Sequence, residues 1–487
     1  MNSASLSSGA SRDSVRSRTK IVATIGPASE EQVGTLIDAG MDVARINFSH
    51  GEPDEHRRRV ENLREASRVR GKAIGILADI PGPKLRLGRF EDGDRTLMEG
   101  EVVRVLQGDG VAGPGEVLFD FGGFLQSVAP GHRMMLADGQ AVLDVEEVRD
   151  DSIVARVLQP GVLGDCKGVH LPDSALDYEL PTPRDRQCID LAVSMGVDMI
   201  GISFVGRASE VETVRSLAPG LATVAKIERR LALENLEEIL EVSDGVMVAR
   251  GDLGVELDLE CVPIVQKSLL RAAREAGCFS ITATEMLESM IGSSRPTRAE
   301  VADVANAVLD GTDALMLSAE TAVGSFPVEA VLTMGRVAAA VEGGPDYLNR
   351  TDRGARSNWE GDTAGAIAIA ASRLAGALGI PKIVCFTESG RTVRLVSRCR
   401  PSAEIIGLSP DEKVVRQMAV LAHVRPMPFP PVESLEDMLT QASRMLLREG
   451  VVGQGEEIVF VAGVPAGVSR STNLVKVHRI GEDVTLH

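Results

Sequence analysis

Aromatic side chains are scarce in this sequence, where phenylalanine, tryptophan and tyrosine make up 3% of 487 residues. With one tryptophan and two tyrosines, the chain has few of the large anchors that protein interfaces favour. This scarcity counts only weakly against a protein partner, because barrels can also associate through aliphatic and charged faces.

Positive charge and long apolar runs are also in short supply. Lysine and arginine number 52 against 70 aspartates and glutamates, which gives a net charge of −18. A nucleic-acid partner needs a basic face, so we expect none. No apolar run approaches the roughly 20 residues of a membrane-spanning helix, so we expect no membrane contact either. A local arginine and lysine cluster could still bind an anionic substrate.

Cysteine occurs six times, widely spaced and without a CxxC pair. This spacing disfavours a cysteine metal site and indicates reduced thiols in a cytoplasmic protein. Residues 1–18 are rich in serine with scattered arginine and have no apolar core. We expect a disordered tail there rather than a signal peptide.

The length predicts about three domains, of which the largest shows a repeated strand–helix pattern. Short, continuously apolar runs indicate strands buried on both faces, as in a parallel sheet. The segments between them look helical, for example Leu259–Gly277 and Pro296–Gly311, the latter with a cap near Ser294. Eight such units predict a (β/α)8 TIM barrel over 19–86 and 180–344. The runs are Ile21–Ile25, Val43–Phe48, Ala73–Ala78, Met199–Phe204, Thr223–Ile227, Gly245–Ala249, Phe279–Ala283 and Ala314–Leu317.

The helical pattern stops once, between the third and fourth runs. Val- and Gly-rich pieces such as Glu101–Leu106 and Gln140–Val145 predict a small inserted β-barrel domain over 87–179. After a polar linker, residues 345–487 predict a C-terminal open α/β domain. Its expected elements are helices Thr363–Leu378, Glu412–Ala422 and Leu435–Gly450 and strands Lys382–Phe386, Glu404–Leu408, Glu457–Ala462 and Asn473–Ile480.

Polar side chains gather at the carboxyl ends of the barrel runs, where this architecture places its active site. Arg45, Asn47 and Ser49 are spaced by two, so in an extended chain they share one face. A single charged strand end is usually solvated or locally paired, but here such ends recur on most runs. The other members are Asp79, Ser203, Lys226, Glu228, Arg250, Asp252, Thr284 and Ser318.

These residue types indicate phosphoryl transfer. Glu228 and Asp252 supply hard oxygen ligands without a neighbouring cysteine or histidine, which suits Mg²⁺ or Mn²⁺. Arg45, Lys226 and Arg250 bring positive charge around those carboxylates, as a shifting phosphoryl charge requires. Neither a Ser-His-Asp triad nor a Walker-A loop is evident, which disfavours hydrolases and P-loop enzymes.

Several segments resemble those of pyruvate kinases. They are TKIVATIGPAS, MDVARINFSHG, KIE, MVARGDLGVE, MLESMI, SRPTRAEVADVANAVLDGTDALMLSAET and TNLVKVHRI. The resemblance runs from about residue 19 to the C-terminus and is weakest in the insertion and the last third. It implies a glycolytic enzyme that transfers the phosphoryl group of phosphoenolpyruvate to ADP, giving pyruvate and ATP. It also implies a homotetramer.

The resemblance implies roles at the matching positions. Arg45 would bind the transferring phosphate, and Lys226 would stabilise the phosphoryl group in flight and the enolate oxygen. Glu228 and Asp252 would hold the divalent ion. Backbone groups at Gly251 and Asp252 would bind the substrate carboxylate, next to a helix start.

Two hydroxyls and a nucleotide site follow from the same resemblance. Thr284 would complete the carboxylate site and, with Ser318, belong to the proton path to the enolate carbon. Glu285, next in the chain, is expected to point into the strand–helix layer. The nucleotide would approach Asn47, His50, Arg86 and Lys167. Since Lys167 lies in the insertion, that domain is expected to close as a lid, unless Lys167 is an ordinary exposed lysine.

One departure from the family concerns the monovalent cation, commonly held by Asn, Ser, Asp and Thr with a nearby Glu. Asn47, Ser49 and Asp79 are present, but Ile80 replaces the threonine and Lys84 the glutamate. A lysine ammonium carries the charge of K⁺, so we expect K⁺ not to be required. Alternatively, Lys84 pairs with a neighbouring carboxylate and the ion still binds.

The sequence allows alternatives both for regulation and for function. TESGRT follows a strand and opens a helix, so it could bind the phosphate of a sugar-phosphate or nucleotide effector. An ordinary capped helix start is the alternative. The loop residues concerned are Thr387, Ser389, Gly390, Arg391 and Thr392. A scaffold without turnover is expected to have lost Lys226, Glu228 or Asp252, and all three are present. Another barrel enzyme of phosphoenolpyruvate chemistry would not need the inserted lid or its CKGVHLP segment.

Overall fold

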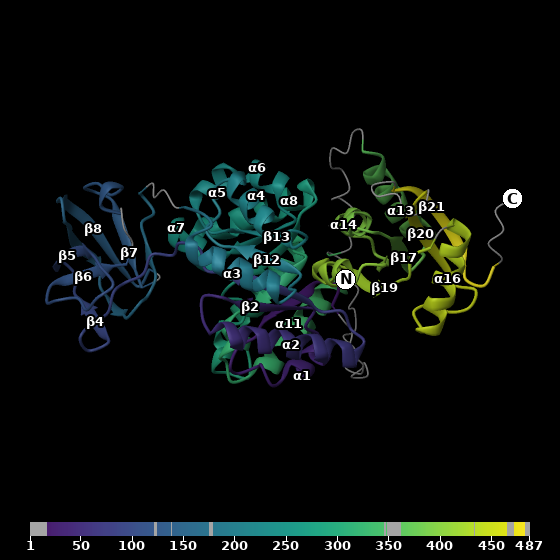
Figure 1. Ribbon diagram of the computed structural model, residues 1–487, viewed down its shortest axis with the longest axis horizontal. Coiled ribbons are helices and arrows are strands. Elements are labelled where there is room, and N and C mark those ends of the chain that lie inside the picture. The colour runs from purple at the N-terminus through teal and green to yellow at the C-terminus, as the bar shows by residue number, and fades with distance from the viewer. Residues whose placement is uncertain are drawn as a thin grey trace, which may run out of the picture. The chain divides into compact units, whose positions relative to one another are not determined.

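The computed structural model describes residues 17–120, 124–137, 139–174, 179–344, 347, 362–432, 434–464 and 472–482. In that part of the chain, eight parallel strands close into a barrel in the order β1-β16-β15-β14-β13-β12-β3-β2. Figure 1 labels β2, β12 and β13 among them. All residues of β3, β14 and β15 are buried, as their continuous apolar character predicted. The predicted barrel is confirmed. Its strands are β1 (Lys20–Thr24), β2 (Val43–Asn47), β3 (Gly75–Ile80), β12 (Met199–Ile202), β13 (Ala222–Ile227), β14 (Gly245–Ala249), β15 (Phe279–Ala283) and β16 (Ala314–Leu317).

Helices follow the barrel strands. Helix α8 ends at Gly277, whose φ of +83° is the left-handed conformation that glycine adopts readily. Helix α9 begins later than predicted, because Thr297 and Glu300 form a capping box and Ser294 is not the cap. The helices are α1 (Val33–Ala39), α2 (Pro53–Arg70), α3 (Pro183–Ser194), α4 (Ala208–Leu217), α5 (Arg230–Glu234), α6 (Leu236–Val242), α7 (Arg250–Glu256), α8 (Val262–Ala276), α9 (Arg298–Asp310), α10 (Ala319–Ala322) and α11 (Pro327–Glu342).

The insertion after β3 is built of strands. Within its described residues these form a curled six-stranded sheet, β11-β7-β8-β9-β5-β6, and a two-stranded sheet, β10-β4. Its core includes Phe119, Phe124 and Leu143. The two ends of the insertion lie side by side, since the Leu87 N–H donates a 2.8 Å hydrogen bond to the Lys167 carbonyl. The strands are β4 (Asp94–Leu97), β5 (Val102–Gln107), β6 (Glu116–Phe119), β7 (Arg133–Leu136), β8 (Ala141–Val148), β9 (Ser152–Gln159), β10 (Gly161–Gly164) and β11 (Val169–His170).

The C-terminal part contains a sheet whose five described strands run in the order β19-β18-β17-β20-β21. Only β21 is antiparallel to its neighbour, so the predicted open α/β fold is confirmed. Strand β19 was not predicted. The elements are β17 (Lys382–Phe386), β18 (Glu404–Ser409), β19 (Val424–Pro428), β20 (Glu457–Gly463), β21 (Thr472–Arg479), α13 (Thr363–Leu378), α14 (Arg391–Arg398), α15 (Glu412–Gln417) and α16 (Leu435–Arg448). No described helix combines the length and apolar character needed to cross a membrane.

His423, just before β19, is a buried histidine in a left-handed conformation, with φ of +65°. The imidazole Nε2 lies 2.9 Å from the hydroxyl of the buried Tyr347, and the backbone N–H of His423 donates to the Arg18 carbonyl. Burial, followed by the positive charges of Arg400 and Arg18, lowers the pKa of His423 well below its ordinary value. The imidazole is therefore neutral in the folded protein near neutral pH.

Candidate active site

A buried cluster of alternating charges lies toward the carboxyl ends of β2, β3 and β13. The guanidinium of Arg45 lies 2.7 Å from Asp79, whose second carboxylate oxygen lies 3.2 Å from the ammonium of Lys226. Lys226 also lies 2.9 Å from Glu228 and donates a 2.7 Å hydrogen bond to Ser203. The side chains of Asp79 and Glu228 are 2% and 1% exposed. Their close pairing with cations offsets the cost of burying these charges.

Burial disfavours every charge in this cluster, and the neighbouring charges decide the outcome. Burial acts to raise the pKa of Asp79, but Lys226 and Arg45 outweigh it and hold the pKa below its ordinary value. Burial acts to lower the pKa of Lys226, but Asp79 and Glu228 leave it above its ordinary value. Glu228 differs, because burial and the charge of Asp252 raise its pKa against the opposing effect of Lys226. A further cation near Glu228 would favour its ionised form.

Glu228 and Asp252 fit a hard divalent cation such as Mg²⁺ or Mn²⁺. Both offer carboxylate oxygens, and the charge of Asp252 raises the pKa of Glu228, a repulsion that a shared cation would relieve. In the described residues, no group of three or more His, Cys, Asp and Glu side chains could hold a metal ion. The remaining ligands would be substrate and water oxygens, which Mg²⁺ commonly keeps.

Lys84 reaches the second of these carboxylates. Its Nζ lies 3.1 Å from Oδ1 of Asp252, and Nε2 of His170 lies 3.9 Å from the same oxygen. Burial acts to raise the pKa of Asp252, but Lys84, Lys226 and His170 together leave it below its ordinary value. The pairing of Lys84 with a neighbouring carboxylate was the alternative that the sequence left open. His170 was not predicted, although it stands in the CKGVHLP segment that supplied Lys167.

The turn that presents Lys84 is held from two sides. The Gly82 N–H donates a 2.9 Å hydrogen bond to Oδ1 of Asp185, a fully buried carboxylate in the first turn of α3. The other oxygen of Asp185 accepts from the N–H and the hydroxyl of Thr182, which caps the helix. Gly82 has φ of +67°, and a Cβ there would lie 2.9 Å from the Ser203 side chain. Only glycine fits this turn without strain.

Asn47 and Ser49, predicted to lie with Asp79 in a cation site, are at the end of β2 and just beyond it. The side-chain oxygen of Asn47 accepts a 3.1 Å hydrogen bond from the Ser49 N–H. The Phe48 N–H between them donates to the Asp79 carbonyl at 3.0 Å. The structure therefore brings this turn against Asp79, whose two carboxylate oxygens already face cations.

The residues that follow β14 and β15 meet next to Asp252, one of the two candidate metal ligands. The Gly251 N–H donates a 2.8 Å hydrogen bond to Oγ1 of Thr284. Thr284 and Glu285 have φ of +67° and +53°, so neither continues the extended strand. The prediction for Glu285 assumed an extended chain and is wrong, since its side chain is exposed. The guanidinium of Arg250 donates to the carbonyls of residues 283–285.

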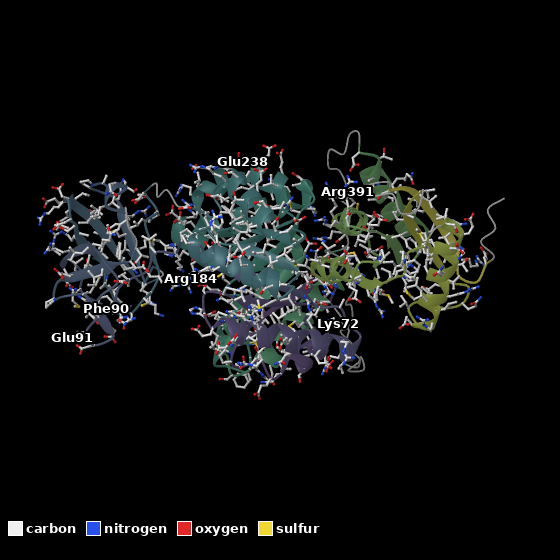
Figure 2. All side chains as sticks on the ribbon, viewed as in Figure 1. Lys72, Phe90, Glu91, Arg184, Glu238 and Arg391 are labelled. Carbon is white, nitrogen blue, oxygen red and sulfur yellow. The ribbon has the colours of Figure 1, made fainter. Side chains whose placement is uncertain are left out.

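A group of cations surrounds His50. The imidazole is partly desolvated and lies near the positive charges of Arg86, Arg45 and Arg184, and all of these effects lower its pKa. Arg184 was missed by the sequence reasoning. Its side chain is exposed near the start of α3 (Figure 2). The available signal was a basic residue two positions after the helix cap Thr182.

Lys167 has an exposed side chain. Its neighbour Cys166 accepts a 3.0 Å hydrogen bond from the guanidinium of Arg86 through its carbonyl. The structure thus brings the chain at Lys167 next to Arg86, another of the predicted nucleotide-binding residues.

Ser318 follows β16, and its backbone is fixed by a buried carboxylate. The Ser318 N–H donates a 2.7 Å hydrogen bond to Oε2 of Glu320, which is fully buried. The other oxygen of Glu320 accepts from the Leu287 N–H at 3.2 Å. Glu320 was not predicted, because its acidic side chain gave no sign in the sequence of being buried.

The predicted effector loop, Thr387–Thr392, follows β17 and leads into α14. Gly390 is the N-cap, with φ of +79°. The hydroxyls of Thr392 and Thr472 lie 2.7 Å apart in the protein interior. Ser389 is exposed, so its hydroxyl is accessible to a ligand while that of Thr392 is not.

A parallel barrel whose strand ends combine the largely buried Arg45 and Lys226 with two carboxylates suited to a divalent cation fits a phosphoryl-transfer enzyme. Two family models match this chain. The pyruvate kinase barrel domain matches residues 16–331, and the pyruvate kinase alpha/beta domain matches residues 365–478. The chain therefore belongs to the pyruvate kinase family and is a phosphotransferase.

Curated pyruvate kinases are similar to this chain over most of its length. That of Mycobacterium tuberculosis is 42% identical over 478 residues, covering 96% of this chain and 99% of the relative. That of Methylorubrum extorquens is 43% identical over 464 residues, covering 94% and 97%. That of Geobacillus stearothermophilus is 41% identical over 479 residues, covering 96% and 81%. Family membership implies phosphoenolpyruvate and ADP as substrates and a divalent metal ion.

Proposed function

We propose that this pyruvate kinase transfers the phosphoryl group of phosphoenolpyruvate to ADP in glycolysis without requiring K⁺. The observation that carries the second part is that both carboxylate oxygens of Asp79, a member of the predicted cation site, already pair with Arg45 and Lys226. The Lys84 ammonium adds a fixed positive charge 3.1 Å from Asp252. That pairing was expected whether or not K⁺ binds.

The experiment measures pyruvate formation from phosphoenolpyruvate, ADP and Mg²⁺ in tetramethylammonium chloride and in KCl at equal ionic strength. Equal turnover is expected. Lys84→Glu should create KCl dependence, whereas Lys413→Glu, the same charge change on α15, should not. Strong KCl activation of the wild type would contradict K⁺ independence but not phosphoryl transfer.

The charged cluster supports the following roles in the reaction. Arg45 and Lys226 bind the oxygens of the transferring phosphoryl group, and Lys226 also stabilises the enolate oxygen left when the P–O bond breaks. Glu228 and Asp252 hold Mg²⁺ or Mn²⁺, which supplies neutralisation of phosphoryl charge. Because these protein charges are fixed before the reaction, they need no reorganisation as charge moves.

The substrate carboxylate binds the backbone of Gly251 and Asp252 and the hydroxyl of Thr284, in place of the hydrogen bonds that the Gly251 N–H and this hydroxyl otherwise donate to Thr284 and Ala283. The first turn of α7 supports this role, since its N–H groups and the positive end of the helix favour an anion. Thr284 and Ser318 belong to the proton path to the enolate carbon. The methyl group of pyruvate forms when that carbon takes up the proton.

The nucleotide binds near Asn47, His50, Arg86 and Lys167. The positive charges of Arg86, Arg45 and Arg184 around His50 support an anionic phosphate chain there. Residues 87–179 act as a lid that excludes water, with Lys167 on the lid side. Lys167→Gln should raise KM for ADP and leave KM for phosphoenolpyruvate unchanged. An unchanged KM for ADP would make Lys167 an ordinary exposed lysine.

Assembly and regulation complete the proposal. The enzyme is a cytoplasmic homotetramer. Light scattering of the purified protein measures its oligomeric state. The loop Thr387–Thr392 binds a phosphate of a sugar-phosphate or nucleotide effector, supported by the exposed Ser389 and the helix start at Gly390. Ser389→Glu should abolish any activation by such compounds while basal turnover persists.

A further inference from the structure

Two consecutive non-glycine residues after β15 adopt the left-handed conformation. Thr284 has φ of +67° and Glu285 has φ of +53°. Non-glycine residues visit this region singly and at an energetic cost, so a consecutive pair needs support from its surroundings. The pair stands where the chain leaves the barrel, beside the carboxylates that bind the metal ion.

The support comes from one side chain. The guanidinium of Arg250 donates through Nε to the Ala283 carbonyl at 3.2 Å. Through Nη2 it donates to the Thr284 carbonyl at 2.7 Å and the Glu285 carbonyl at 3.3 Å. A planar guanidinium presents several donors in a fixed geometry, which a lysine ammonium cannot reproduce. Arg250 thus holds three successive carbonyls in one arrangement.

The same helix turn fixes the Thr284 side chain. The Gly251 N–H, one residue after Arg250, donates to Oγ1 of Thr284 at 2.8 Å, and that hydroxyl donates to the Ala283 carbonyl at 2.6 Å. The first turn of α7 therefore determines both the backbone and the hydroxyl direction of Thr284. If the left-handed pair relaxed toward extended geometry, the hydroxyl would leave the Gly251 amide.

We propose that Arg250 is a positioning residue, which holds the left-handed pair Thr284–Glu285 so that the Thr284 hydroxyl stays in the site. This inference rests on the proposed function of Thr284 in binding the substrate carboxylate and in the proton path. Arg250 acts through the backbone of the pair, not by contact with the phosphoryl group. Its loss should therefore impair carboxylate binding and proton transfer while the divalent ion still binds.

The experiment compares Arg250→Gln and Arg250→Lys with the control Arg271→Gln, an exposed arginine on α8. Three quantities are measured: kcat/KM for phosphoenolpyruvate, exchange of pyruvate methyl protons with deuterium by NMR, and Mn²⁺ affinity by electron paramagnetic resonance. Both Arg250 variants should lose roughly 10- to 100-fold in the first two, the scale of a small misplacement. Mn²⁺ affinity should change little, and the control should behave as the wild type.

Suppression by a second substitution separates positioning from a general structural role. Glycine adopts positive φ without a Cβ clash, so Glu285→Gly should restore much of the activity that Arg250→Gln loses. Glu285→Gly alone should keep near-normal activity. Normal kcat/KM and exchange in both Arg250 variants would overturn the inference, as would a loss that Glu285→Gly leaves unchanged. An inactive wild type would contradict the proposed function itself, whereas an active wild type with unaffected Arg250 variants contradicts only this role.

Discussion

The ammonium of Lys226 in β13 lies 2.9 Å from Oε1 of Glu228, the first residue after that strand. The same ammonium lies 3.2 Å from Asp79, so this one largely buried cation pairs with two carboxylates. In the proposed reaction, a phosphoryl group would add negative charge next to a lysine that is already held in place. The strongly acidic chain thus has two neighbouring cations, Arg45 and Lys226, at the proposed site.

Lys226→Met should reduce kcat by at least roughly 100- to 1,000-fold, the scale of removing a preorganised stabilising group. It should also lower the melting temperature, since Asp79 and Glu228 would be left buried without their shared cation. Steady-state kinetics and thermal unfolding test this, with Lys72→Met as the control for loss of a paired barrel lysine. A kcat within tenfold of wild type would contradict the assigned role.

Glu228→Gln should weaken Mn²⁺ binding by at least roughly 10- to 100-fold, the loss typical even for partners behind a metal ligand. The substitution removes a charged oxygen ligand while keeping the side chain's size. Titration followed by electron paramagnetic resonance measures the affinity without any turnover. Glu238→Gln on α6 (Figure 2) is the matched control. Unaltered Mn²⁺ affinity would place the metal ion elsewhere.

Asp185→Asn should make turnover respond to KCl. The amide cannot accept hydrogen bonds on both sides as the carboxylate does from Gly82 and Thr182, so the turn that presents Lys84 should loosen. Unfolding free energy should fall by about 1–3 kcal/mol. Asp437→Asn, a change to a first-turn carboxylate of α16 that accepts a hydrogen bond from the N-cap Ser434, is the control. Reduced stability without a KCl response would limit Asp185 to a structural role.

Acid should destabilise the protein through His423. Burial, then Arg400, Arg18 and Lys20, lower its folded-state pKa, so below the ordinary histidine pKa of about 6.5 the unfolded chain binds a proton that the folded one does not. Stability should therefore fall as pH drops below that value, by up to ~1.4 kcal/mol per pH unit. Asparagine tolerates positive φ. The His423→Asn variant should therefore show a weaker dependence of melting temperature on pH between roughly pH 7 and 5. An unchanged slope would exclude His423 as the cause; His132→Asn serves as control.

The barrel and the gathering of polar residues at its strand ends could be predicted because they depend on simple regularities. The polar residues that the structure brings together there are Arg45, Asp79, Lys226 and Glu228. Continuous apolar runs are buried on both faces, and the ends of parallel strands meet at one rim. The side-chain directions of Arg250 and Asp252 could not be predicted in this way, because they depend on where the strand ends. Residues two apart share a face in a strand, but β14 ends at Ala249 and both residues lie in α7. In a helix, residues two apart point in different directions.

Other elements were missed because local sequence and tertiary position disagree. Strand β19 contains Pro426 and Pro428, which argue against a strand unless it lies at a sheet edge, and β19 is the edge of its sheet. Asp185 and Glu320 are fully buried acidic residues, and each accepts one hydrogen bond from a residue distant in sequence, Gly82 and Leu287 respectively. Such partners follow only from the folded arrangement.

The two ends of the insertion lie next to each other, and this affects the order in which the chain folds. Strand β3 pairs in register with β12, Leu77 opposite Met199, although the whole insertion separates them. Bringing such distant residues together costs chain entropy and slows folding. Once the inserted sheet has formed, the bridge between Arg86 and Gly168 holds its two ends together, so the loop still to be closed is short. We therefore expect the insertion to fold early, which shortens the loop that must be closed when β3 pairs with β12 to complete the barrel.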